Sequence, residues 1–175
     1  PIALFVPRRI YLSTVEVRKV FVQQFFIPGI AQSSYLLGAG STCAIVDPAR
    51  DVERYLDAAG ELDLAITHVL ETHLHADFVS GHMELAATAG ATICAPASGR
   101  CEFEHVAVGD GSRVDVEELR VDVLDTPGHT PDGVTYVVTD TARGDEPAAA
   151  FTGDALFVGD VGRPDLFPGR ARELA

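Results

Sequence analysis

Residues 72–81 read THLHADFVSG and follow a β-rich segment at Ala65–Leu70. In extended backbone, residues two apart point to the same side, so the His73 and His75 imidazoles could face one point. Asp77 would continue that face, although a turn into the next helix is expected there. Imidazole and carboxylate groups this close together are typical of a metal site, and a histidine cluster on an open surface is the alternative.

Two later segments each place a candidate ligand directly after a predicted strand. Residues 126–131 read TPGHTP, and the Pro-Gly turn would hold His129 in place. Residues 151–154 read FTGD, where the glycine lets the backbone come close to whatever Asp154 binds. The sequence therefore predicts that several ligand-bearing loops meet at one edge of a sheet.

The ligand types suit a first-row divalent ion without selecting one. Two histidines and one carboxylate with open positions are the pattern of non-haem Fe(II) oxygenases, whereas three histidines with solvent would suit zinc. The remaining histidines, His68, His82 and His105, are expected to be structural or solvent-facing, and His82 lies close to the first motif.

Composition limits the classes of partner. The chain has 175 residues, enough for one domain, and 26 acidic against 13 basic residues give a formal charge of −13. Such an acidic surface argues against nucleic acid or an anionic membrane as the main partner. No apolar run approaches the roughly 20 residues that span a bilayer, and we expect a cytoplasmic protein. Three cysteines without a CxxC pair are expected to be free thiols.

The order of elements favours a sheet sandwich with helices outside. Helices are expected at Asp51–Ala59, ending at a Gly60 cap, and at His82–Ala89, ending at Gly90. There is no G-x-G-x-x-G and no P-loop, so nucleotide binding has no support. The predicted strands are Val20–Phe26, Ser34–Leu37, Cys43–Val46, Ala65–Leu70, Thr92–Ala95, Leu119–Leu124, Val134–Val138 and Ala149–Phe151.

The three motifs THLHAD, TPGHTP and FTGD, in this order, resemble those of the metallo-β-lactamase superfamily. That resemblance implies an α/β (α+β) fold, the αβ/βα sandwich, with the metal site at one edge. Two longer strings, HADFVSGH (75–82) and FTGDALFVGDVGRPDL (151–166), are similar to those of the persulfide dioxygenases. This branch of the superfamily includes the ethylmalonic encephalopathy protein. The resemblance is greatest to the bacterial persulfide dioxygenases that are often fused to a rhodanese domain. We expect residues 20–175 to form this domain, incomplete at its C-terminus, and residues 1–19 to be an N-terminal extension or first strand.

The resemblance also implies a ligand set. The iron ligands of the persulfide dioxygenases map onto His73, His129 and Asp154. His75 and Asp77 would then lie near the metal as groups that hold water and orient the ligands, or as additional ligands.

Phe78 departs from the two-metal pattern of the superfamily. Members of the superfamily with two metals carry the pattern HxHxDH, and its last histidine helps to hold the second ion. Phe78 stands at that position in this chain and cannot bind a metal. The resemblance therefore implies one Fe(II) per chain, with Zn(II) as the alternative.

The activity implied is oxidation of a small persulfide, such as glutathione persulfide, by O2 to sulfite and thiol. Arg163 is a candidate for binding the substrate carboxylate, and an ion pair with Asp165 is its alternative role. A rhodanese-type sulfurtransferase and a second copy of the chain are possible partners. Two other functions stay open: a zinc thioester hydrolase of the glyoxalase II kind, and a metal-binding fragment with little activity alone.

Overall fold

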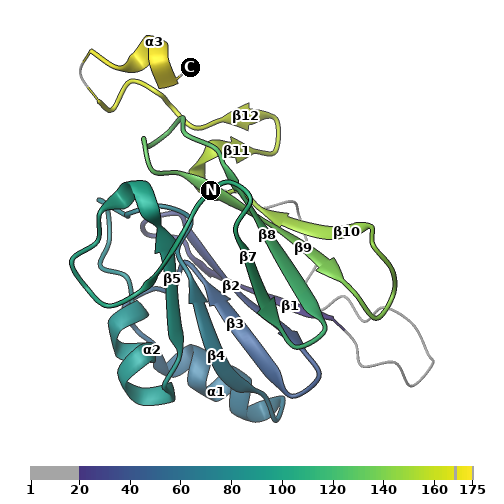
Figure 1. The fold of residues 1–175 in the computed structure, drawn as a ribbon. Helices are drawn as coiled ribbons and strands as arrows, with labels where there is room; N and C mark the ends of the chain where they lie inside the picture. Colours follow the sequence, from purple (N-terminus) through teal and green to yellow (C-terminus); the bar gives the residue numbers. More distant parts are fainter. Residues whose placement is uncertain (1–19, 168, 175) are drawn as a thin grey trace.

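A mixed six-stranded sheet faces an antiparallel four-stranded sheet, and two helices cover the outer face of the first sheet (Figure 1). The structure is a computed structural model that describes residues 20–167 and 169–174. The extension or first strand expected at residues 1–19 lies outside the described residues. The layers match the α/β sandwich predicted from the sequence.

The first sheet has the strand order β1-β2-β3-β4-β5-β6. Strands β1 to β3 pair antiparallel, whereas β3 to β6 pair parallel. A parallel pair needs a crossover, and here α1 (Glu53–Glu61) joins β3 to β4 and α2 (His82–Ala89) joins β4 to β5. The strands are β1 (Phe21–Ile27), β2 (Gln32–Ala39), β3 (Thr42–Val46), β4 (Ala65–Leu70), β5 (Thr92–Pro96) and β6 (Val106–Val108).

The second sheet has the order β10-β9-β8-β7 and is antiparallel throughout. After β10 the chain forms a small hairpin and then a short helix, α3 (Ala171–Leu174). The strands are β7 (Arg113–Val116), β8 (Leu119–Asp125), β9 (Val134–Asp140) and β10 (Pro147–Phe151), and those of the hairpin are β11 (Leu156–Phe157) and β12 (Asp160–Val161).

Two apolar clusters hold the layers together, and β3 contributes to both. Its Ala44 and Val46 side chains lie in the cluster between the two sheets, whereas Cys43 and Ile45 lie in the cluster under the helices. This alternation follows from the two-residue period of a strand. Tyr55 of α1 is fully buried in the helical cluster. The central strand is therefore apolar on both faces, as expected for a strand between two layers.

The predicted elements are confirmed, with one correction. All eight predicted strands are present, and α2 ends at Gly90, which has a left-handed backbone with φ 71°. The prediction that α1 ends at a Gly60 cap was wrong. The helix continues to Glu61, because the left-handed residue that turns the chain is Asp63, with φ 54°.

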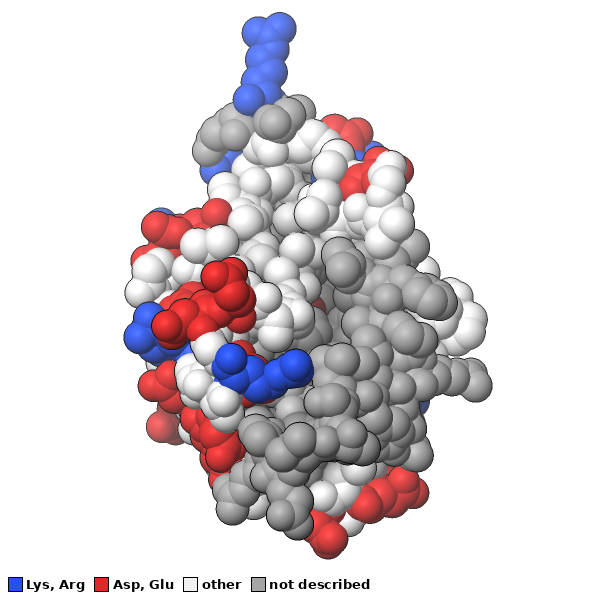
Figure 2. Space-filling model, turned by 90° about the vertical axis from the view of Figure 1, so that its right-hand side faces the viewer, with Lys and Arg blue, Asp and Glu red and all other residues white. Residues whose placement is uncertain are grey.

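The surface is acidic, and on the face drawn in Figure 2 acidic side chains form several patches among few basic ones. In the described part of the chain, no helix is long and apolar enough to cross a membrane.

The three cysteines are free, as predicted, and differ in their surroundings. Burial raises the pKa of the Cys43 thiol to about 12 and that of Cys94 to about 11. Cys101 is partly exposed, and burial raises its pKa in the same direction.

We predict that native protein at pH 8 takes up one alkyl group from iodoacetamide, at Cys101, because Cys43 and Cys94 are buried as neutral thiols. Intact-mass and peptide analysis would measure the uptake, with alkylation in urea as the reference for three reacted thiols. Modification of Cys43 or Cys94 in folded protein would contradict this burial.

Candidate metal centre

The three sequence motifs meet at one edge of the sandwich, where strands of both sheets end. The first motif follows β4, the second follows β8 and the third follows β10. Two hydrogen bonds join the sheets at this edge: the Tyr136 hydroxyl donates to the Glu71 carbonyl at 2.8 Å, and the Val134 N–H donates to the Thr72 carbonyl at 2.8 Å. The segment after β4, which carries the first motif, is therefore held to β9 of the second sheet by one side-chain and one backbone hydrogen bond.

His73, His129 and Asp154 form one group of candidate ligands. Each offers one ligand atom, and these atoms all lie within 4.8 Å of one another. The Nε2 atom of His129 is 3.6 Å from Oδ2 of Asp154. His73 is buried, and the other two side chains are partly exposed, so the group is open on one side. The structure thus brings together the three residues that the family resemblance implied as ligands.

The chemistry of the donor set shows that this group fits a divalent ion. Two imidazoles and one carboxylate are ligands that first-row metals use. The His129 nitrogen near Asp154 is Nε2, and its Nδ1 is buried without a hydrogen-bond partner among the described residues.

Two glycines leave room for the group. Gly153 has a positive φ of 52°, and a Cβ there would collide with the Thr72 hydroxyl and lie 3.3 Å from Nδ1 of His73. A Cβ at Gly162 would collide with the Asp154 carbonyl. The glycines of the TGD and VGR strings are therefore required by the close approach of backbone to ligands.

A chain of hydrogen bonds orients His73. The Thr72 hydroxyl donates to Oδ2 of Asp47 at 2.8 Å and lies 3.0 Å from Nδ1 of His73. Burial opposes ionisation of Asp47, but His75 and the Thr72 N–H outweigh it and lower the Asp47 pKa, so this carboxylate is an acceptor. The hydroxyl proton therefore points to Asp47, and the oxygen accepts from Nδ1–H of His73. This leaves Nε2 of His73 as the atom with a lone pair for a metal.

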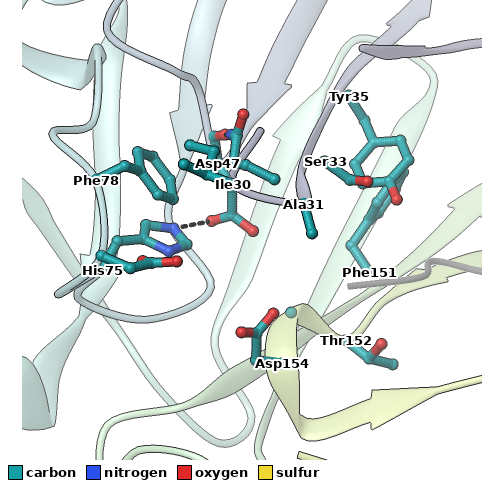
Figure 3. Close-up of a pocket in the computed structure, with 13 residues that line it drawn as sticks. Ile30, Ala31, Ser33, Tyr35, Asp47, His75, Phe78, Phe151, Thr152 and Asp154 are labelled. Carbon is teal, nitrogen blue, oxygen red and sulfur yellow. Dashed lines mark hydrogen bonds and ion pairs between the residues drawn. The ribbon is translucent and has the colours of Figure 1, made fainter. Parts of the chain in front are cut away.

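His75 points into a second group, with Asp47 and Glu71. Its Nε2 is 3.1 Å from Oδ1 of Asp47 (Figure 3). The same atom is 3.5 Å from Oε2 of Glu71. Burial opposes its charge, but the Asp47 carboxylate, the hydrogen bond to it and Glu71 raise the His75 pKa to about 9. Phe78 lies over the ring, with a centroid distance of 4.3 Å.

The second group also has ligand atoms within 4.8 Å of one another. The described residues thus contain two groups that could hold a metal, which is compatible with a two-metal centre. Binding of one ion per chain therefore stays a prediction. Sequence reasoning missed Asp47 and Glu71. The signal available for Asp47 was its position at the end of a predicted strand, Cys43–Val46, like the other candidate ligands.

The other predicted site residues lie at the margins. Asp77 is exposed beside the centre, and its charge contributes to the raised pKa of His75. Arg163 donates to both carboxylate oxygens of Asp165, at 2.8 and 3.0 Å, on the exposed surface. This is the ion pair considered as its alternative role, and binding of a substrate carboxylate by Arg163 stays a prediction.

The remaining histidines have contacts within the protein. His82 lies 3.2 Å from Glu71, beside the second group, and stacks on Phe103. His68 contacts the Thr67 hydroxyl, and His105 contacts the Phe103 carbonyl.

Two hollows open beside the centre. The larger is a groove of about 750 Å³ that His73, His129 and Asp154 line together with residues of the C-terminal segment. The smaller, of about 130 Å³, lies between the β1–β2 turn and Phe78, with Asp154 on its opposite wall (Figure 3). A ligand in the groove would therefore contact all three residues of the first group.

We predict that Thr72→Val weakens metal binding by about 10- to 100-fold, because it removes the hydroxyl between Asp47 and His73 while keeping the side-chain volume. Thr72→Ser, which keeps the hydroxyl, is the matched control and should bind nearly as tightly as the parent. Competition with a chromophoric chelator would measure both affinities. Equal affinity of the valine variant and the parent would show that the hydroxyl does not orient the ligand.

Solved structures of similar proteins share this fold. A metallo-beta-lactamase from Staphylococcus aureus superposes with a TM-score of 0.79 at 37% identity, covering 86% of this chain and 48% of that one. ETHE1 from Myxococcus xanthus superposes with a TM-score of 0.77 at 36% identity, covering 87% of this chain and 65% of that one.

Among curated proteins, a hydroxyacylglutathione hydrolase from Pseudomonas putida is 37% identical over 136 residues, which are 75% of this chain and 49% of that protein. The chain thus spans about half the length of the curated relatives it matches. The profile of the metallo-beta-lactamase superfamily matches residues 27–175. With its motifs gathered at one edge of the sandwich, the chain belongs to the metallo-beta-lactamase superfamily.

Proposed function

We propose that the protein is a persulfide dioxygenase with one Fe(II) bound by His73, His129 and Asp154. The observation that carries the proposal is that Nε2 of His75 is already engaged by the Asp47 and Glu71 carboxylates. The His75 ring lies beside that of His73, with centroids 4.2 Å apart, and Phe78 covers it. What remains is two histidines and one carboxylate with open positions, the set typical of non-haem iron oxygenases.

Contacts within the second group favour a single ion. Both Asp47 oxygens already accept hydrogen bonds from Thr72, one from its N–H at 2.7 Å and one from its hydroxyl. Glu71 accepts from the Ser80 hydroxyl at 2.5 Å and lies within reach of His82. With its histidine charged, this group already pairs an imidazolium with two carboxylates, and a second cation there would displace those donors.

The reaction balances with three small reactants. Glutathione persulfide, O2 and water give glutathione and sulfite with two protons, and the four electrons lost by the outer sulfur reduce O2. A bound Fe(II) supplies the redox partner for O2 and a Lewis acid for the anionic sulfur.

The chain's own residues position the reactants. The groove gives access to the ligand group from one side, so a substrate sulfur and O2 would approach along the same path. Phe78 covers the His75 ring and offers no atom that could bind a metal. The similarity to ETHE1 from Myxococcus xanthus supports the persulfide dioxygenase branch. Supply of the persulfide by a rhodanese-type sulfurtransferase, and a homodimer, are part of the same proposal.

A zinc-dependent thioester hydrolase of the glyoxalase II kind is the second candidate. The curated relatives are hydroxyacylglutathione hydrolases, and the second group of Asp47, Glu71 and His75 has ligand chemistry. Hydrolysis would use a metal-activated water, for which two ions are the usual arrangement in such enzymes. Both candidates act on a sulfur compound, and they differ in metal, metal count and need for O2.

If the protein is a persulfide dioxygenase, we predict that the Fe(II)-loaded protein consumes O2 and forms sulfite when it receives glutathione persulfide. His129→Ala should abolish both, since it removes one of three ligands, whereas His105→Ala, which lies outside the group, should retain them. An oxygen electrode and a sulfite assay measure the products. A folded, iron-loaded sample that consumes no O2 would rule out this function.

Metal count separates the two candidates independently of turnover. We predict one ion per chain after loading with Fe(II) or Zn(II) and desalting, measured by plasma mass spectrometry. Two ions per chain, together with cleavage of S-lactoylglutathione by the zinc form, would favour the hydrolase.

A further inference from the structure

The groove beside the metal centre has a basic side chain at its C-terminal wall. Arg170 lines the groove together with His73, His129 and Asp154, and no other Lys or Arg lines it in the described part of the chain. The groove volume, about 750 Å³, lies in the range of small-molecule sites. Arg170 therefore faces the same space as the three candidate ligands.

Contacts of α3 hold this wall close to the second motif. The Arg170 N–H donates to the Phe167 carbonyl at 3.1 Å, and the Leu174 N–H donates to the Arg170 carbonyl at 3.0 Å. Leu174 is buried, and its carbonyl lies 3.6 Å from the Cβ position at Gly128. The helical turn that begins at Arg170 is thus anchored beside the turn that carries His129.

The groove combines apolar walls with this one cation and three acidic residues. Leu74, Leu166 and Phe167 line it and are between 37% and 44% exposed, so they offer apolar surface to a ligand. Of the acidic lining residues, Asp132 accepts the Leu74 N–H at 2.8 Å, Asp154 belongs to the ligand group and Asp77 is exposed. The chain's formal charge of −13 repels anions at long range. An anionic substrate therefore needs a local cation in the groove.

We propose that Arg170 binds a carboxylate of the substrate and makes the groove selective for thiol derivatives that carry one. The proposal deepens the proposed function and holds for either candidate, because a persulfide or thioester of glutathione carries carboxylates at a distance from its sulfur. The guanidinium fork matches a carboxylate in two-point contact. Arg163, the candidate from the sequence, is not among the residues that line the groove and pairs with Asp165 on the exposed surface.

The test compares substrates with and without carboxylates on the Fe(II)-loaded full chain. Arg170→Gln should raise KM for glutathione persulfide about 10-fold or more, as expected for loss of a charge-assisted hydrogen bond, with kcat changed less than about twofold. KM for the persulfide of glutathione dimethyl ester should stay unchanged. Arg170→Lys should recover part of the loss. Arg172→Gln, an exposed arginine of α3 outside the groove lining, is the matched control and should equal the parent.

A binding measurement separates this inference from the proposed reaction. Calorimetry with S-methylglutathione and its dimethyl ester needs no turnover, and the parent should prefer the free acid while Arg170→Gln should not. If no persulfide is oxidised but this preference is present, the reaction fails and the role of Arg170 stands. If Arg170→Gln affects acid and ester equally, or neither, the role of Arg170 is overturned.

Discussion

The buried carboxylate of Asp47 is the interaction on which the metal edge depends. It follows β3 in the first sheet and accepts the Thr72 N–H, the Thr72 hydroxyl and the His75 ring. These contacts engage a different nitrogen in each histidine of the first motif: Nδ1 of His73 through the Thr72 hydroxyl, and Nε2 of His75 through the carboxylate itself. The two rings remain neighbours, with centroids 4.2 Å apart. A buried carboxylate without these donors would be costly, by several kcal/mol, so the loop conformation and the carboxylate stabilise each other.

This arrangement bears on the proposal that a motif with two neighbouring histidines serves a centre that uses one. Strand geometry predicts that residues two apart share a face, and the two rings do lie together although the chain leaves the strand at Leu70. The partners on the neighbouring strand end then decide where each ring points. Phe78, stacked on His75, closes that side with an apolar ring.

Sequence reasoning succeeded where the signal was local. The helix His82–Ala89 and the strand Ala65–Leu70 have the predicted bounds, because a glycine stop and an apolar run are readable within one element. It failed at Val106–Val108 and Arg113–Val116, which are short strands whose formation depends on pairing with β5 and β8. Likewise, the three candidate ligands follow from motifs, but the partnership of Asp47 with Thr72 spans 25 residues and leaves no local pattern.

Charge connects the centre to its surroundings. The candidate ligands carry one negative charge, on Asp154, so a divalent ion there would leave a net positive charge of about one, which favours an anionic sulfur. The second group adds no attraction for an anion, since its two carboxylates outweigh its one charged histidine. On a chain with a formal charge of −13, a substrate anion would thus be attracted within the groove, which is lined both by the residues that would hold the ion and by Arg170. Selectivity then rests on the separation between sulfur and carboxylate in the substrate, a distance that the rigid sandwich edge and the anchored α3 set together.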